Sequence, residues 1–155
     1  MRRREKGAAL VEAAIVIPLL LILLFGLIEF GRYIAMTSTV TNASREAARF
    51  AAGTGPGSGS GPRYADCDGM RAAAQEFGVL GAPTDGEITL EFDEGPSTGI
   101  FLVCSGSTVD PNDIETGDRI ISTVTVPFQP IVPLISAFLG PFDISVQTIR
   151  TINKG

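Results

Sequence analysis

The stretch KGAALVEAAIVIPLLLILLFGLIEFGR, residues 6–32, decides how this chain of 155 residues is organised. Residues 13–28 carry no charged side chain, and residues 8–28 carry only Glu12. With a rise of 1.5 Å per residue, a helix over residues 8–28 is roughly 30 Å long, which matches the hydrocarbon core of a bilayer. The stretch therefore predicts a membrane-spanning helix with one carboxylate near its start.

The charges on the two sides of this stretch differ in sign. The residues before it are basic, with a single acid, Glu5, among Arg2, Arg3, Arg4 and Lys6. Residues 54–155 contain five basic and 13 acidic side chains, a net charge of −8. A basic flank favours a cytoplasmic N-terminus with the rest of the chain outside. The acidic remainder argues against nucleic acid as a partner, because phosphate contacts depend on Lys and Arg.

The helical pattern continues beyond the apolar stretch as far as Ala52. Apolar or small residues recur there at helical spacing, namely Tyr33, Met36 or Thr37, Val40, Ala43 or Ser44, Ala47 and Phe50. A stripe with a period of 3.6 residues is typical of an amphipathic helix. The sequence thus predicts one helix over residues 8–52, bent near Pro18, which removes a backbone hydrogen bond.

Residues 63–155 are predicted to form an extracytoplasmic head, joined to the helix by a Gly/Ser/Pro linker at 53–62. A short helix is predicted from Tyr64 to Phe77, and alternating or β-branched residues predict strands near residues 88–92, 100–104, 120–128 and 142–152. The apolar segment 130–141 is predicted to be a helical turn or a hydrophobic loop. The fold class is therefore α+β, a long N-terminal transmembrane and amphipathic helix carrying a small head with a short helix and a roughly four-stranded antiparallel sheet.

Cys67 and Cys104 are the two cysteines of the chain, and both lie in the predicted head. Disulfides persist outside the cytoplasm, so a bridge between them is predicted, with two buried thiols that do not pair as the alternative. The bridge would close a loop of about 38 residues and stabilise the head by roughly 3–4 kcal/mol.

The composition also restricts the chemistry. The chain has no histidine, so a Ser-His-Asp or Cys-His nucleophile is excluded within one chain. The acidic segment VDPNDIETGD, residues 109–118, departs from a calcium loop because Ile114 occupies a ligand position and Gly117 comes too late. An Asx-type turn is predicted there instead. The sequence predicts no enzyme, no cofactor and no metal site.

Two sets of charged residues follow the apolar stretch. Glu29 and Arg32 lie three residues apart and could pair on one helical face, or they could be interfacial anchors with little coupling. The second set consists of Asn42, Arg45, Glu46 and Arg49. These side chains could form a contact with another subunit, or they could be a solvated face of the helix.

The residues around the basic leader, 1–7, resemble a type IV prepilin signal. Lys6-Gly7 is followed by Ala8-Ala9-Leu10-Val11-Glu12, with the glutamate at the fifth position after the glycine. The longer stretch GAALVEAAIVIPLLLILLFGLIEFGR, together with NASREAARFAA, resembles the TadE-like proteins of Tad/Flp-type pilus systems, which are pseudopilins or minor pilins. The C-terminal VTVPFQPIVPLISAFLG resembles the same family more loosely.

The resemblance implies that a prepilin peptidase cuts between Gly7 and Ala8, and that Glu12 pairs with the new N-terminal amine of a neighbouring subunit. A charge at the bilayer centre costs about 2.5–3.5 kcal/mol, and an opposite charge nearby lowers that cost. A Glu12 that snorkels or is protonated, without a partner, is the alternative. Small residues let membrane helices approach closely, so packing is expected at Ala9, Ala13, Ala14 and near Pro18.

The predicted function is that of a TadE-like pseudopilin or minor pilin in the assembly of a Tad/Flp-type pilus or secretion apparatus. Its expected partners are the prepilin peptidase, other Tad pseudopilins, the major pilin, the inner-membrane assembly platform and the lipid bilayer, and surface adhesion would follow from the filament. One alternative is a bitopic membrane-anchored binding protein with an acidic extracytoplasmic head. Another is a secreted enzyme released by signal cleavage near residue 36.

Overall fold

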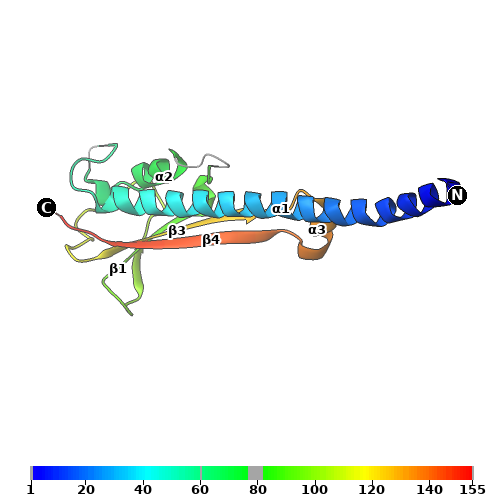
Figure 1. The fold of residues 1–155 in the computed structure, drawn as a ribbon. Helices are drawn as coiled ribbons and strands as arrows, with labels where there is room; N and C mark the ends of the chain where they lie inside the picture. Colours follow the sequence, from blue (N-terminus) through cyan, green and yellow to red (C-terminus); the bar gives the residue numbers. More distant parts are fainter. Residues whose placement is uncertain (1, 60, 77–81, 155) are drawn as a thin grey trace. The chain divides into compact units, whose positions relative to one another are not determined.

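The computed structural model of the chain describes residues 2–59, 61–76 and 82–154. These residues form two compact units, which are described separately. The first unit contains the chain up to Ile34 together with Gln129–Phe142, and the second contains Ala35–Phe128 together with the residues from Asp143 onwards. One helix, α1 (Arg2–Ala52), contributes residues to both units (Figure 1).

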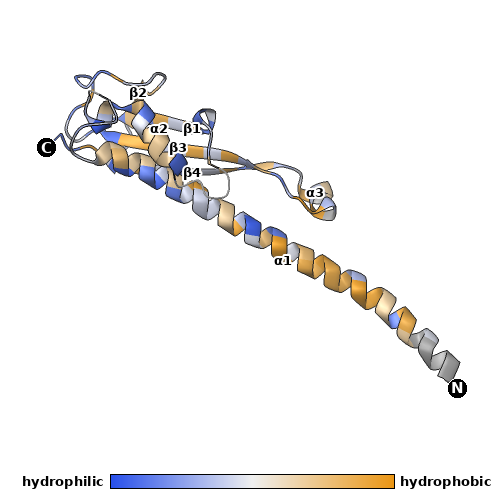
Figure 2. Ribbon diagram, turned by 90° about the horizontal axis from the view of Figure 1, so that it is seen from above, coloured by the Kyte–Doolittle hydropathy of each residue, from blue (hydrophilic) through white to orange (hydrophobic). Residues whose placement is uncertain are grey.

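Helix α1 begins at Arg2, earlier than the predicted start at Ala8. Arg, Glu and Lys are good helix formers, and a single glycine in a helix costs only about 1 kcal/mol, so Gly7 does not interrupt it. The helix continues through Pro18, and Figures 1 and 2 show it curving towards its N-terminal end. At its other end the amide of Gly53 donates to the carbonyl of Phe50 over 3.2 Å.

In the first unit, the segment 129–142 contains the short helix α3 (Pro133–Leu139). Of the two predicted forms for this segment, the structure has the helical one. Proline suits the first turn of a helix, because its missing N–H has no intrahelical partner there. The helix stops at Gly140, whose φ of 61° lies in the left-handed region that glycine adopts without a steric penalty.

The second unit contains a four-stranded antiparallel sheet with the strand order β2-β1-β3-β4. Its strands are β1 (Ile88–Asp93), β2 (Ile100–Val103), β3 (Arg119–Phe128) and β4 (Phe142–Thr151). Strands β1 and β3 pair in a register that sets Ile88 opposite Val124 and Phe92 opposite Ile120. Together with the long apolar helix, this sheet confirms the predicted α+β fold class.

The C-terminal part of α1 packs on one face of this sheet. Its stripe of small residues is buried, with Ala43, Ala47 and Ala48 fully inaccessible to solvent. Because these side chains are short, the helix backbone approaches the sheet closely, and the hydroxyl of Ser44 donates to the carbonyl of Ser122 over 2.9 Å. The sheet contributes larger apolar side chains to the same core, namely Ile88, Leu90, Phe92, Ile120, Val124, Val126, Phe128 and Ile144.

Helix α2 (Cys67–Glu76) follows a single 3-10 turn at Arg63–Ala65 and buries Met70 and Ala74. It is shorter at its start than the predicted helix from Tyr64 to Phe77. Phe77 and the glycines predicted to end the helix lie outside the described residues, as does Ser60 of the predicted linker. A second 3-10 turn, Asp85–Glu87, precedes β1.

Candidate functional site

The first half of α1 exposes most of its large apolar side chains. Their exposed fractions reach 71% at Leu10 and Leu23, and Figure 2 colours this part of α1 orange. Among the described residues, α1 is the one helix long and apolar enough to cross a membrane by its length and composition. A contiguous apolar surface of this extent marks a membrane or protein contact. The helix therefore fits a single-pass membrane protein.

Glu12 lies within this apolar part of α1 and is exposed. In the described part of the chain no hydrogen bond or ion pair reaches its carboxylate. Among the described residues Glu12 thus has no partner, and its predicted pairing with another subunit's amine stays a prediction.

The predicted packing residues lie on the same helix. Ala9, Ala14 and Pro18 are exposed and Ala13 is half-buried, so their surfaces are available to a second helix. Gly7 is exposed, and a Cβ built on it meets no atom within 4 Å. The side chain of Ala8, the other half of the predicted processing site, lies outside the described residues.

Glu29 makes the contacts that organise the first unit. It forms an ion pair with Arg32, one of the two arrangements considered for these residues, at 2.6 Å between Oε1 and Nη1. Its other oxygen, Oε2, accepts hydrogen bonds from the backbone N–H groups of Ile131 and Val132 over 3.2 and 3.3 Å. The residue is only 5% exposed as a result. Glu29 therefore ties the segment before α3 to the helix.

Sequence reasoning missed this tether. The three- and four-residue spacing rules identify Arg32 as a neighbour on the helix, but Ile131 lies 102 residues further along the chain. One signal was present in the sequence. An acidic residue at the end of an apolar span needs several donors, and a proline-rich segment has backbone N–H groups that no regular helix or strand uses.

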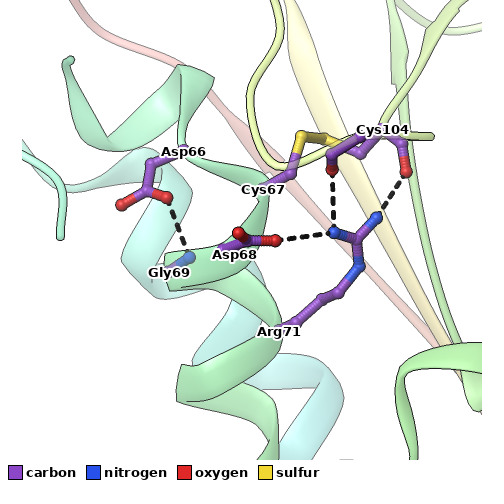
Figure 3. Close-up of a disulfide and its surroundings, with 7 residues drawn as sticks. Asp66, Cys67, Asp68, Gly69, Arg71 and Cys104 are labelled. Carbon is purple, nitrogen blue, oxygen red and sulfur yellow. Dashed lines mark hydrogen bonds and ion pairs between the residues drawn. A yellow bond between two sulfur atoms is a disulfide. The ribbon is translucent and has the colours of Figure 1, made fainter. Parts of the chain in front are cut away.

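The second unit contains the predicted disulfide between Cys67 and Cys104, which is confirmed with a Cα–Cα distance of 5.8 Å. It joins the first residue of α2 to the residue after β2. Arg71 reinforces the same junction, because its guanidinium donates to the carbonyls of Cys104 and Gly106 over 2.6 and 2.9 Å (Figure 3). Asp68 accepts from the same guanidinium over 3.1 Å.

The carboxylate of Asp66, next to this disulfide, fixes the loop that follows α1. It accepts hydrogen bonds from the hydroxyl of Ser58 over 2.6 Å and from the amide of Gly69 over 2.9 Å. Burial alone would raise the pKa of Asp66, but these hydrogen bonds outweigh burial and hold the pKa below its usual value. The ionised form of Asp66 is thus part of the fold.

A second ion pair joins β1 to β3. The guanidinium of Arg119 donates to both carboxylate oxygens of Asp93 over 2.7 and 2.5 Å. These hydrogen bonds lower the pKa of Asp93 despite its burial, and they raise the pKa of Arg119. The pair links two neighbouring strands and contributes to the stability of the head.

The polar groups weighed in the sequence have structural roles or face solvent. Asn112 donates its amide to the carboxylate of Asp110 over 2.9 Å, which is the predicted Asx-type turn, and Ile114 is fully buried. Across the described ranges, no three His, Cys, Asp or Glu side chains are grouped so that they could hold a metal ion. On α1, Asn42, Arg45 and Arg49 are exposed, and Arg49 pairs with Glu46 at 2.6 Å.

The comparisons with known proteins single out α1. The model of the family described as TadE-like protein matches residues 7–49, which covers the apolar part and most of the amphipathic part of this helix. Comparison with curated proteins gave no match, and comparison with solved structures gave none either. The sequence resemblance is confirmed over this range, and residues 7–49 are similar to the TadE-like family.

Proposed function

We propose that this chain is a structural subunit, a pseudopilin or minor pilin, of a Tad/Flp-type pilus or secretion apparatus. The observation that carries the proposal is that the TadE-like region coincides with a helix whose first half is apolar and uncovered. Such a surface requires lipid or neighbouring helices around it. A subunit that moves between a membrane and a helical assembly meets both requirements with the same surface.

The proposed maturation step is hydrolysis of the Gly7–Ala8 peptide bond by a prepilin peptidase on the cytoplasmic side. The basic leader, with Arg2, Arg3 and Arg4, favours retention of the N-terminus in the cytoplasm. Because α1 runs through this bond, the first turns of the helix must unwind for the bond to enter an active site. Glycine lowers the cost of that unwinding, since it is a poor helix former.

Hydrolysis leaves a free amine on Ala8, four residues before Glu12. Four residues along a helix correspond to about 6 Å of rise. In an assembly, the amine of a neighbouring subunit would neutralise the exposed carboxylate of Glu12 and set the stagger between helices. An ion pair is more favourable in lipid than in water, because the dielectric constant is lower there. The pairing also removes an uncompensated charge from the apolar surface.

The proposed orientation puts the head outside the cytoplasm, among other pilus components. The Cys67–Cys104 disulfide supports this orientation, because such bonds persist in oxidising compartments. The net charge of −8 beyond Gly53 agrees with it, since basic residues concentrate on the cytoplasmic side. Contacts with the other pseudopilins, the major pilin and the inner-membrane platform would be made chiefly through α1.

Mass spectrometry of the N-terminus, after coexpression with a prepilin peptidase, tests the proposal. The expected mature chain begins at Ala8, and Gly7→Leu is expected to abolish processing while the helix is kept, because a Cβ at this position meets no atom within 4 Å. Gly31→Leu is the matched control, as Gly31 is also an open glycine of α1, and it leaves cleavage intact. A mature protein that retains its leader would contradict the proposal and favour the membrane-anchored binding protein.

The role of Glu12 needs a separate measurement. Glu12→Ala is expected to insert into membranes and to be cleaved as the unmodified chain is, but to lose copurification with partner pseudopilins. Glu76→Ala is the control, because it removes an exposed carboxylate of α2, outside the helix that is expected to pack against other subunits. Unchanged copurification of Glu12→Ala would contradict the pairing.

A further inference from the structure

The segment 129–142 forms a second uncovered apolar surface beside α1. It contains no Asp, Glu, Lys or Arg. Ile131 is 67% exposed and Leu139 is 66% exposed, and the exposed Pro133 and Ala137 lie between them. These values are as high as those of the apolar side chains of α1 itself, so the segment is as poorly suited to water as the spanning helix.

The tether at Glu29 fixes the position of this segment along α1. Residues 9–28 form about 30 Å of helix, which is the thickness of a hydrocarbon core. Glu29 follows directly, and its carboxylate holds the amides of Ile131 and Val132. The segment and this part of α1 belong to the same compact unit, so the segment lies where the span leaves the hydrocarbon.

Several backbone and side-chain polar groups of the segment have partners within the protein. Pro130, Pro133 and Pro141 have no N–H group. The hydroxyl of Ser136 donates to the carbonyl of Pro133 over 3.0 Å, and its amide donates to Val132 over 2.9 Å. Backbone groups that lack partners are costly in lipid, whereas these groups are already paired. The segment can therefore enter an apolar environment with little penalty.

Aromatic side chains mark the same position. The rings of Tyr33 on α1 and Phe142 lie 6.1 Å apart, one turn beyond Glu29. Tyrosine is enriched at membrane interfaces, where its ring contacts lipid and its hydroxyl reaches water. Charge returns immediately afterwards, at Asp143.

We propose that the segment 129–142 is an interfacial membrane anchor, which inserts Ile131 and Leu139 into the boundary between lipid headgroups and acyl chains where α1 emerges. Its partner is the bilayer that α1 spans, because the segment is tethered at Glu29, where the apolar part of α1 ends. A short apolar segment can lie in this zone without spanning it. The inference requires α1 to cross the membrane but does not depend on a role in a pilus.

The absence of tryptophan from the chain gives a direct test, because each introduced tryptophan is the single one in the protein. The full chain carrying Leu139→Trp is reconstituted in lipid vesicles, and its emission is measured with acyl-chain-brominated lipids and with aqueous acrylamide. Leu21→Trp reports the spanning helix, and Ile149→Trp reports an exposed apolar position on β4, 43% exposed. Ile131→Trp repeats the measurement at the other end of the segment.

The expected result is that brominated lipid quenches Leu139→Trp and Leu21→Trp but not Ile149→Trp, whereas acrylamide quenches Ile149→Trp most strongly. Quenching of Leu139→Trp by acrylamide alone would overturn the proposal, because the segment would then be in water. Protection from both quenchers would also overturn it, since a second protein chain would then cover the segment. Quenching of Ile149→Trp by brominated lipid would also overturn the proposal, because the head would then adhere to the bilayer non-specifically. If brominated lipid does not quench Leu21→Trp, α1 does not span the bilayer, and the proposal is overturned together with its premise.

Discussion

Replacing Glu29 tests how the first unit is held together. Glu29→Ala removes the acceptor for the amides of Ile131 and Val132 and the partner of Arg32. The two backbone hydrogen bonds are long, at 3.2 and 3.3 Å, so each is assigned about 1 kcal/mol, the usual net value. The ion pair to Arg32 adds little, because the Arg32 side chain is 39% exposed and solvent screens the charge. The expected loss is about 2 kcal/mol of local stability.

Amide hydrogen exchange of the reconstituted protein, followed by NMR, measures this loss. Local opening governs such exchange, so about 2 kcal/mol corresponds to exchange about 30-fold faster at Ile131 and Val132. Glu29→Gln keeps one acceptor oxygen but not the charge, and it should give an intermediate increase. Glu46→Ala, which removes an exposed ion pair on the same helix, should leave both amides unchanged. Exchange at the original rate in Glu29→Ala would refute the tether.

Three further predictions concern the head. Reduction of the disulfide should lower the free energy of unfolding of the head by about 3–4 kcal/mol. Chemical denaturation with and without reductant measures this loss, and an unchanged midpoint would mean that no bridge forms. Gly69→Ala should destabilise by about 1–3 kcal/mol, because the added Cβ would lie 2.6 Å from Cζ of Phe50, whereas Gly86→Ala meets no atom and should be neutral in the same assay. Asp66 and Asp93 have lower pKa values in the folded than in the unfolded chain. Their contribution to the free energy of unfolding should therefore be complete above the unfolded-state pKa of about 3.9, and it should disappear as the pH falls through the lower folded-state pKa values. Thermal unfolding between pH 6 and pH 2 checks this, and stability that stays constant over that acid range would contradict it.

The local elements were predictable because short-range patterns in the sequence encode them. The alternation of Ile88, Leu90 and Phe92 indicates which side of a strand is buried, and the structure buries all three. The small-residue stripe of α1 is likewise buried at Ala43 and Ala47. The disulfide partners followed from the number of cysteines, since two cysteines allow one intrachain pairing. Each of these inferences depends on side-chain period or composition alone.

The start of α1 was predicted less well, because the leader was treated as a separate element. Arg2 to Lys6 favour a helix by their own propensity, and nothing within the leader opposes it. A local preference of the same kind sets the start of β1, just after Glu87. A capping arrangement, in which its carboxylate accepts from the amide of Thr84 over 2.6 Å, competes locally with the strand and prevails.

The sequence by itself determined the apolar span, the TadE-like pattern and the side of each element that is buried, because these depend on residues close together in the chain. Only the tertiary structure decided the strand order β2-β1-β3-β4, the bond from Ser44 to Ser122 and the tether from Glu29 to Ile131. The first of these hydrogen bonds joins residues that are 78 positions apart in the sequence, and the second joins residues that are 102 positions apart. No local period specifies such pairs, which form only when burial of the whole set of side chains brings them together.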